Sequence, residues 1–173
     1  MLPVLFAAAL AVAAPPAGVV EGVACVVDQT SPADIDWVGD QILAGQDLGD
    51  GAQMGRLTEH IAACIDRYGW DEPLALQVST LSVSQMARTI AVRRLSAAGI
   101  EPAALDRWFA AQSEDFRTRA FVTMSEEEAA AVLESLAPGT LSPELFERHG
   151  ELVGGYLASL VVAARIERGL PLE

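Results

Sequence analysis

Three features of the sequence predict an all-α fold: a single domain in which five to six helices form an irregular bundle after an N-terminal signal segment. Helix-start signals recur, in which Ser, Asp or Glu precedes a proline, and glycine follows where several of the helices should end. The chain is 51% hydrophobic but only 6% aromatic, so its core should consist of Leu, Val, Ile and Ala between closely spaced helices. Strand signals are confined to residues 18–28, which hold two Val-Val pairs and are interrupted by Glu21 and Gly22.

The N-terminus carries an apolar run from Leu2 to about Ala14. It has the length of a signal-peptide hydrophobic region, about 7 to 15 residues, and is shorter than the roughly 20 residues needed to cross a bilayer. The small residues of Ala11-Val12-Ala13 match a cleavage site, which predicts a signal peptide over residues 1–13 and an exported mature protein, periplasmic or secreted. No Lys or Arg precedes the run. The alternatives are a buried N-terminal helix and a membrane-tethered structural protein that retains this helix.

Cys25 and Cys64 are the two cysteines of the chain. An even number in an exported protein favours a disulfide between them. In the loop-entropy model, closing a loop of about 40 residues stabilises the fold by about 4 kcal/mol. Three other interpretations stay open: two unpaired thiols, a lipoprotein cleavage box over residues 22–25 with Cys25 lipidated, and a metal held by His60 and Cys64. The last supplies only two of the three or four ligands that a zinc site needs.

Residues 14–30 are expected to form an extended segment that carries Cys25, and residues 31–173 the helical domain. The first helix is expected over residues 32–44, because Ser31 precedes a proline at the first helical position and Gly45 follows the last. Asp50 is expected to cap a second helix that ends at Gly69. Its apolar residues recur at steps of three and four, which places Cys64 on the buried face.

The third helix is expected to be the longest, over residues 73–98, between Asp71-Glu72-Pro73 and Gly99. A cluster of Ser and Thr over residues 79–84 lowers its helix propensity and favours a kink. A fourth helix is expected over residues 102–112, with Leu105, Trp108 and Phe109 facing inward. The sequence of residues 113–123 fits either another helical turn or an irregular link.

A capping box of Ser125 and Glu128 predicts a fifth helix over residues 125–136, and Ser142-Pro143 starts a last helix that reaches Arg168. Residues 152–164 of the last helix are almost wholly apolar. Because this stretch is too short to cross a membrane, it should be a central core helix. Gly150 and Gly154 form a pair of small residues four apart, which favours the close approach of a neighbouring helix.

The chain has a net charge of −13, and all eleven of its basic residues are arginine. Such an acidic protein is repelled by nucleic-acid backbones and by anionic membrane surfaces, so both are disfavoured as partners. Residues 21–55 hold seven acids and no base, whereas residues 85–120 hold six arginines and four acids. Two interpretations follow: the arginines pair with acidic helices on either side, or a group such as Arg88, Arg93 and Arg94 forms a local anion-binding face.

No motif of a hydrolase, a nucleotide-binding protein or a metalloenzyme is found, so no catalytic, cofactor-binding or metal-ligating residue is predicted and no cofactor is expected. The expected function is a non-catalytic binding or interaction module that takes an unknown protein or small ligand in a groove between helices. The alternative is an enzyme of unrecognised type, in which His60 or His149 titrates near neutral pH. The site residues that the sequence predicts are Cys25 and Cys64, as a disulfide pair.

Overall fold

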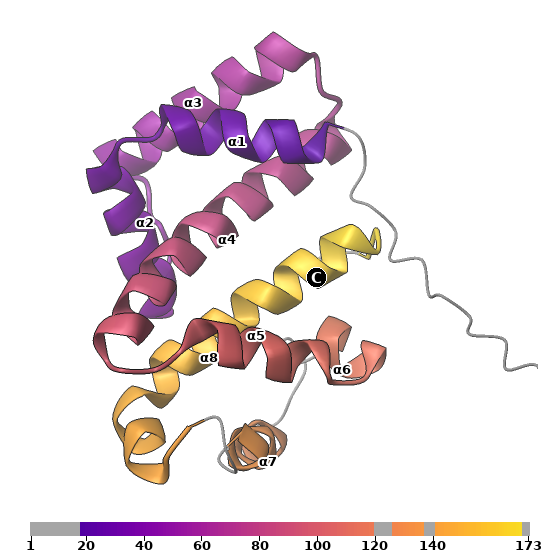
Figure 1. Cartoon of the computed structure of the whole chain (residues 1–173). Helices are drawn as coiled ribbons and strands as arrows, with labels where there is room; N and C mark the ends of the chain where they lie inside the picture. The colour runs from indigo at the N-terminus through magenta and orange to yellow at the C-terminus, as the bar shows by residue number, and fades with distance from the viewer. Residues whose placement is uncertain (1–17, 120–125, 137–140, 171–173) are drawn as a thin grey trace, which may run out of the picture.

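The computed structural model describes residues 18–119, 126–136 and 141–170 (Figure 1). No strand occurs in these ranges, which confirms the all-α prediction. The described residues form eight helices, two or three more than predicted, because residues 19–29 and 114–119 are helical as well. The helices are α1 (Val19–Gln29), α2 (Pro32–Leu43), α3 (Ala52–Tyr68), α4 (Glu72–Ala97), α5 (Pro102–Ala110), α6 (Glu114–Arg119), α7 (Glu126–Leu136) and α8 (Pro143–Glu167).

The N-terminal segment differs from the prediction. An extended segment was expected over residues 14–30, and this is wrong for residues 19–29, which form α1. Strand propensity mainly measures how a side chain packs, and here the valines pack as a helix: Val19 and Val26 are fully buried. Gly18 starts the helix with a φ of 99°, a left-handed conformation that suits glycine. The signal peptide predicted over residues 1–13 lies outside the described residues.

Three of the six predicted helix starts are confirmed by their caps. Ser31, Asp71 and Ser142 each accept a hydrogen bond from the backbone N–H three residues later, at 3.1 to 3.3 Å. The predicted cap at Asp50 is wrong, since α3 has Gly51 as its N-cap residue. Glycine at this position costs a helix only a few tenths of a kcal/mol, so the start can shift by one residue. Ser125, of the predicted capping box, lies outside the described residues.

Two hydrophobic clusters make up the core, and α4 runs through both (Figure 1). Its first half contributes Val78 and Met86 to a cluster with α1, α2 and α3. Its second half contributes Leu95 to a cluster with α5 and α8, in which Tyr156 and Leu157 are fully buried. The prediction that the apolar stretch of the last helix lies in the core is therefore confirmed. Among the helices of the described residues, none is both long and apolar enough to cross a membrane.

Glycine allows helices to approach closely at three positions, Gly22, Gly39 and Gly155, and two of these contacts involve α2. A Cβ atom added to Gly39 of α2 would lie 2.2 Å from Cγ1 of Ile90 in α4. A Cβ atom added to Gly155 of α8 would lie 2.8 Å from Cδ2 of Leu43 in α2. Each helix pair therefore packs more closely there than any larger residue would allow.

The predicted close approach at Gly150 and Gly154 is wrong. A Cβ atom on Gly154 would have no neighbour within 4 Å, and one on Gly150 would meet only Phe146 of the same helix, at 3.3 Å. The spacing of small residues says nothing about which side of a helix meets a neighbour. In α8, the side that meets a neighbouring helix includes Gly155, the residue after Gly154.

Candidate functional site

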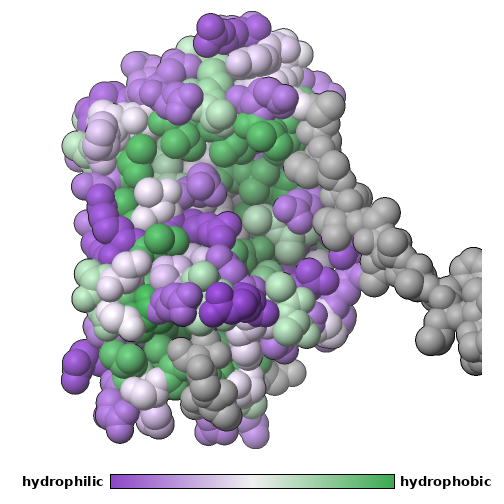
Figure 2. Space-filling view, viewed as in Figure 1, coloured by the Kyte–Doolittle hydropathy of each residue, from purple (hydrophilic) through white to green (hydrophobic). Residues whose placement is uncertain are grey.

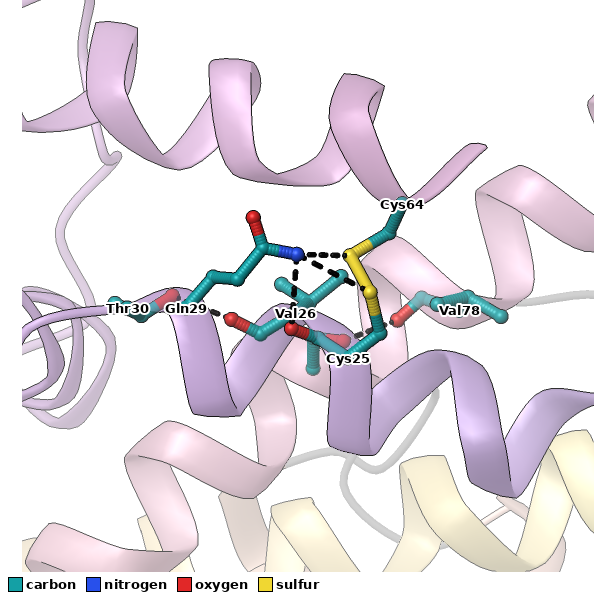
Figure 3. Close-up of a disulfide and its surroundings, with 7 residues drawn as sticks. Cys25, Val26, Gln29, Thr30, Cys64 and Val78 are labelled. Carbon is teal, nitrogen blue, oxygen red and sulfur yellow. Dashed lines mark hydrogen bonds between the residues drawn. A yellow bond between two sulfur atoms is a disulfide. The ribbon is translucent and has the colours of Figure 1, made fainter. Parts of the chain in front are cut away.

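A disulfide joins Cys25 of α1 to Cys64 of α3, with an S–S distance of 2.07 Å and the Cα atoms 6.2 Å apart (Figure 3). This confirms the predicted pair. With both sulfur atoms bonded, Cys25 has no thiol to carry a lipid and Cys64 has none to bind a metal. Both residues are buried, and the cysteine of α3 lies on the buried face that its helical spacing predicted.

The side chain of Gln29 covers the disulfide (Figure 3). Its Nε2 atom donates to Sγ of Cys64 at 2.9 Å and lies 3.2 Å from Sγ of Cys25. Because Gln29 lies one turn after Cys25, the bond and the amide together hold the last two turns of α1 against α3. This attachment fixes the rotation of α1 about its own axis. It therefore also fixes which residues of α1 face away from α3.

An apolar groove of about 180 Å³ lies between α1 and α8. Helix α4 packs against both of them and contributes to the lining. Figure 2, in the view of Figure 1, shows apolar surface over α1 and beside it toward α4. The lining side chains are aliphatic except for Gln85 and Glu167, and they are Val19, Val20, Val23, Leu81, Gln85, Ala163, Ile166 and Glu167.

The groove exists because α1 is apolar on three sides. Val26 faces the core, Cys25 faces α3, and Val20 and Val23 lie toward a third side, where α8 does not cover them. Val20 keeps 61% of its surface exposed. Sequence analysis missed this site because residues 18–28 were expected to be extended. The signal was present in the steps of three and four that connect Val19, Val23 and Val26.

The arginines near the end of α4 pair with the acidic helix α2, which confirms the first interpretation of the charges for the acidic helix on the N-terminal side. Arg93 donates to Asp36 at 2.6 Å, and Arg94 pairs with Asp40. Arg88 lies 3.2 Å from Asp106. The three arginines of the alternative anion-binding face are thus engaged with carboxylates, which leaves that interpretation without support from them.

Arg88 and Asp106 belong to a cluster with Tyr156 that connects α4, α5 and α8. The hydroxyl group of Tyr156 donates to Asp106 at 2.7 Å, and the guanidinium of Arg88 lies 5.6 Å from the centre of the tyrosine ring. Burial, and then the hydrogen bond to Asp106, raises the pKa of Tyr156. The phenol therefore stays protonated at neutral pH, where it donates a hydrogen bond and does not act as a base. This arrangement suits a structural connection between three helices.

The two histidines, His60 and His149, are on different helices. His60 of α3 is partly buried, and its Nδ1 atom is buried without a hydrogen-bond partner among the residues that the structure describes. His149 is in the first half of α8, which lies far from α3 in Figure 1. Within the described ranges, no group of three or more His, Cys, Asp or Glu side chains could hold a metal ion. The structure thus does not bring the two histidines together in one site.

Asp34, next to His60 on the neighbouring helix, should make stability depend on pH in the acid range. Its hydrogen bond with Arg56, and then that with Ser31, lowers the pKa of the carboxyl group below its ordinary value. A lowered pKa in the folded state means that the stabilisation is present above the ordinary aspartate pKa of about 3.9 and is lost as the pH falls through the lower value. Asp34→Asn should therefore flatten the acid limb of a plot of melting temperature against pH between about 5 and 2.

Arg56→Gln provides the second arm of this measurement. It removes the guanidinium that lowers the pKa of Asp34, so it should flatten the same limb while keeping the carboxyl group. A wild-type slope in both variants would contradict the assignment. Thermal unfolding followed by circular dichroism is sufficient to compare the three proteins.

The function of the groove is inferred from the chemistry of its lining residues. No protein-family model, curated protein or solved structure matches this chain. What the described residues offer is a preformed aliphatic groove with a carboxylate at its edge, built on a helix that a disulfide holds in place.

Proposed function

We propose that this protein is an exported, non-catalytic binding module that takes an apolar group of a ligand or partner protein in the groove between α1 and α8. The observation that supports the proposal is the aliphatic lining of the groove together with the exposure of Val20. Burying apolar surface is favourable by about 25 cal/mol per Å², and concave apolar sites are where proteins use this gain.

The way in which α1 is held in place supports the same function. A groove binds more tightly when it is formed before the ligand arrives, because no ordering cost is then added to binding. Here the disulfide to Cys64 fixes one side of α1, and the burial of Val19 and Val26 fixes another. The wall that carries Val20 and Val23 is therefore held in place without a ligand.

Export is supported by the disulfide, because such bonds persist in oxidising compartments. It also agrees with the apolar run over residues 1–13. Mass spectrometry of protein recovered from the periplasm or medium should give a chain that begins at Ala14. Alkylation without reduction should modify neither cysteine. An intact Met1 in the membrane fraction, or two alkylated cysteines, would contradict export with cleavage.

Occupation of the groove can be measured with a small apolar probe. In a titration with isobutanol, the methyl NMR signals of Val20, Val23 and Ile166 should shift in a saturable way. Leu76, which is 64% exposed on α4 and does not line the groove, is the internal control and should shift little. Ala163→Phe places a ring in the groove and should abolish the shifts. Equal shifts at Leu76 and at the groove methyls would show that the groove has no binding property of its own.

A further inference from the structure

The size of the groove limits what can occupy it. Sites for drug-sized ligands measure about 300 to 1,000 Å³. The groove measures about 180 Å³, close to a cavity of about 150 Å³ that accepts benzene. Its recessed part therefore fits one branched aliphatic or phenyl group.

A group of this size cannot bind tightly alone. Burial of one aliphatic side chain supplies less free energy than even a millimolar complex requires. Anchor side chains in protein interfaces solve this problem, because a small pocket takes one residue while the surrounding surface adds further contacts. The occupant that fits is thus a side chain of a larger partner.

The charge around the groove is negative. Glu167 is exposed in the lining. Neither α1 nor α2 contains a basic residue. At the C-terminal end of α8, the C-cap residue Arg168 pairs with Glu114 and Arg165 donates to the carbonyl of Thr118, so both reach toward α6. An acidic rim favours a basic partner.

We infer that the occupant is a segment of a partner protein that inserts one leucine-sized or phenyl side chain between α1 and α8 and carries Lys or Arg one helical turn away, facing Glu167. This inference rests on the proposed function and adds the chemistry of the partner. On a helix, residues four apart share a face, so an anchor with basic residues at four positions before and after it meets both requirements.

Three synthetic peptides test the inference. The probe is a 16-residue helical peptide of alanine and glutamine with one central leucine and lysines four positions to each side. Its matched versions replace the leucine by serine, or both lysines by glutamate. With the full-length exported protein at low salt, fluorescence anisotropy should show affinity for the first peptide, and each replacement should weaken it about tenfold.

Matched variants of the protein locate the contacts. Val20→Ser should weaken binding of the leucine peptide about fivefold, and Leu76→Ser, an equally exposed position outside the groove, should not. Glu167→Gln should weaken it about threefold and reduce its dependence on salt, whereas Glu151→Gln on the same helix should do neither. All four positions are partly or fully exposed, so the variants should fold.

The possible outcomes separate the two proposals. If isobutanol occupies the groove but the glutamate peptide binds as well as the lysine peptide, the groove binds apolar groups and the basic partner is wrong. Equal binding of the leucine and serine peptides would overturn the anchor. Absence of both isobutanol and peptide binding would refute the proposed function itself. Concentration-dependent dimerisation that Val20→Ser abolishes would assign the groove to a second copy of this chain and would also overturn the inference.

Discussion

Replacing Cys25 and Cys64 together by alanine should lower the free energy of unfolding by about 4 kcal/mol. The two cysteines are 39 residues apart in the sequence, and a crosslink over a loop of this length removes much of the conformational freedom of the unfolded chain. A domain has a total stability of about 5 to 15 kcal/mol, so the loss is a large share of it. Urea denaturation followed by circular dichroism measures the change.

Reduction of the wild-type protein is the control for this variant. In the presence of dithiothreitol the wild-type midpoint should fall to that of the double variant, and the variant itself should not respond. Amide hydrogen exchange adds a local test, because loss of the bond should speed exchange in α1 more than in α8, whose core contacts do not depend on it. Identical urea midpoints for the variant and the oxidised wild type would show that the bond does not stabilise the fold.

Local chemistry explains the parts of the fold that could be predicted. A cap such as Ser31 or Asp71 acts on backbone groups three residues away, so its signal is complete within a few letters of sequence. The buried position of Cys64 likewise follows from steps of three and four on its own helix, and the disulfide to Cys25 follows from the count of two cysteines in a chain expected to be exported. These predictions did not require any knowledge of how the helices are arranged.

The groove depends on three helices at once, and this is why sequence reasoning did not reach it. Valine pairs such as Val19-Val20 have a high strand propensity, and the prediction of an extended segment depended on it. In the structure, burial of these valines against α4 determines that the segment is helical. Even a correct helix would not reveal that Val20 stays exposed, because this requires the position of Ile166 and Glu167 on α8. The same limitation led to Gly150 and Gly154 being chosen over Gly155 as contact residues.

Gly39→Ala should destabilise the protein by about 2 kcal/mol or more, although alanine is the better helix former by about 1 kcal/mol. The new Cβ atom would lie 2.2 Å from Cγ1 and 2.7 Å from Cβ of Ile90, a buried residue on the helix that α2 packs against. Such an overlap forces the two helices apart, which costs more than the gain in helix propensity. Gly55→Ala is the matched control: a Cβ atom there meets nothing within 4 Å, so it should stabilise by up to about 1 kcal/mol.

A double variant distinguishes steric overlap from any other effect at Gly39. Ile90→Ala alone should cost about 2 to 5 kcal/mol, because it leaves a cavity in a fully packed region. With Ile90 shortened, the methyl group of Gly39→Ala enters space that the isoleucine vacated, and a small shift of α2 relieves the remaining overlap with Cβ. The double variant should therefore be more stable than the sum of the single changes by about 1 kcal/mol or more, measured from urea midpoints. Strict additivity would mean that α2 and α4 do not meet at this glycine.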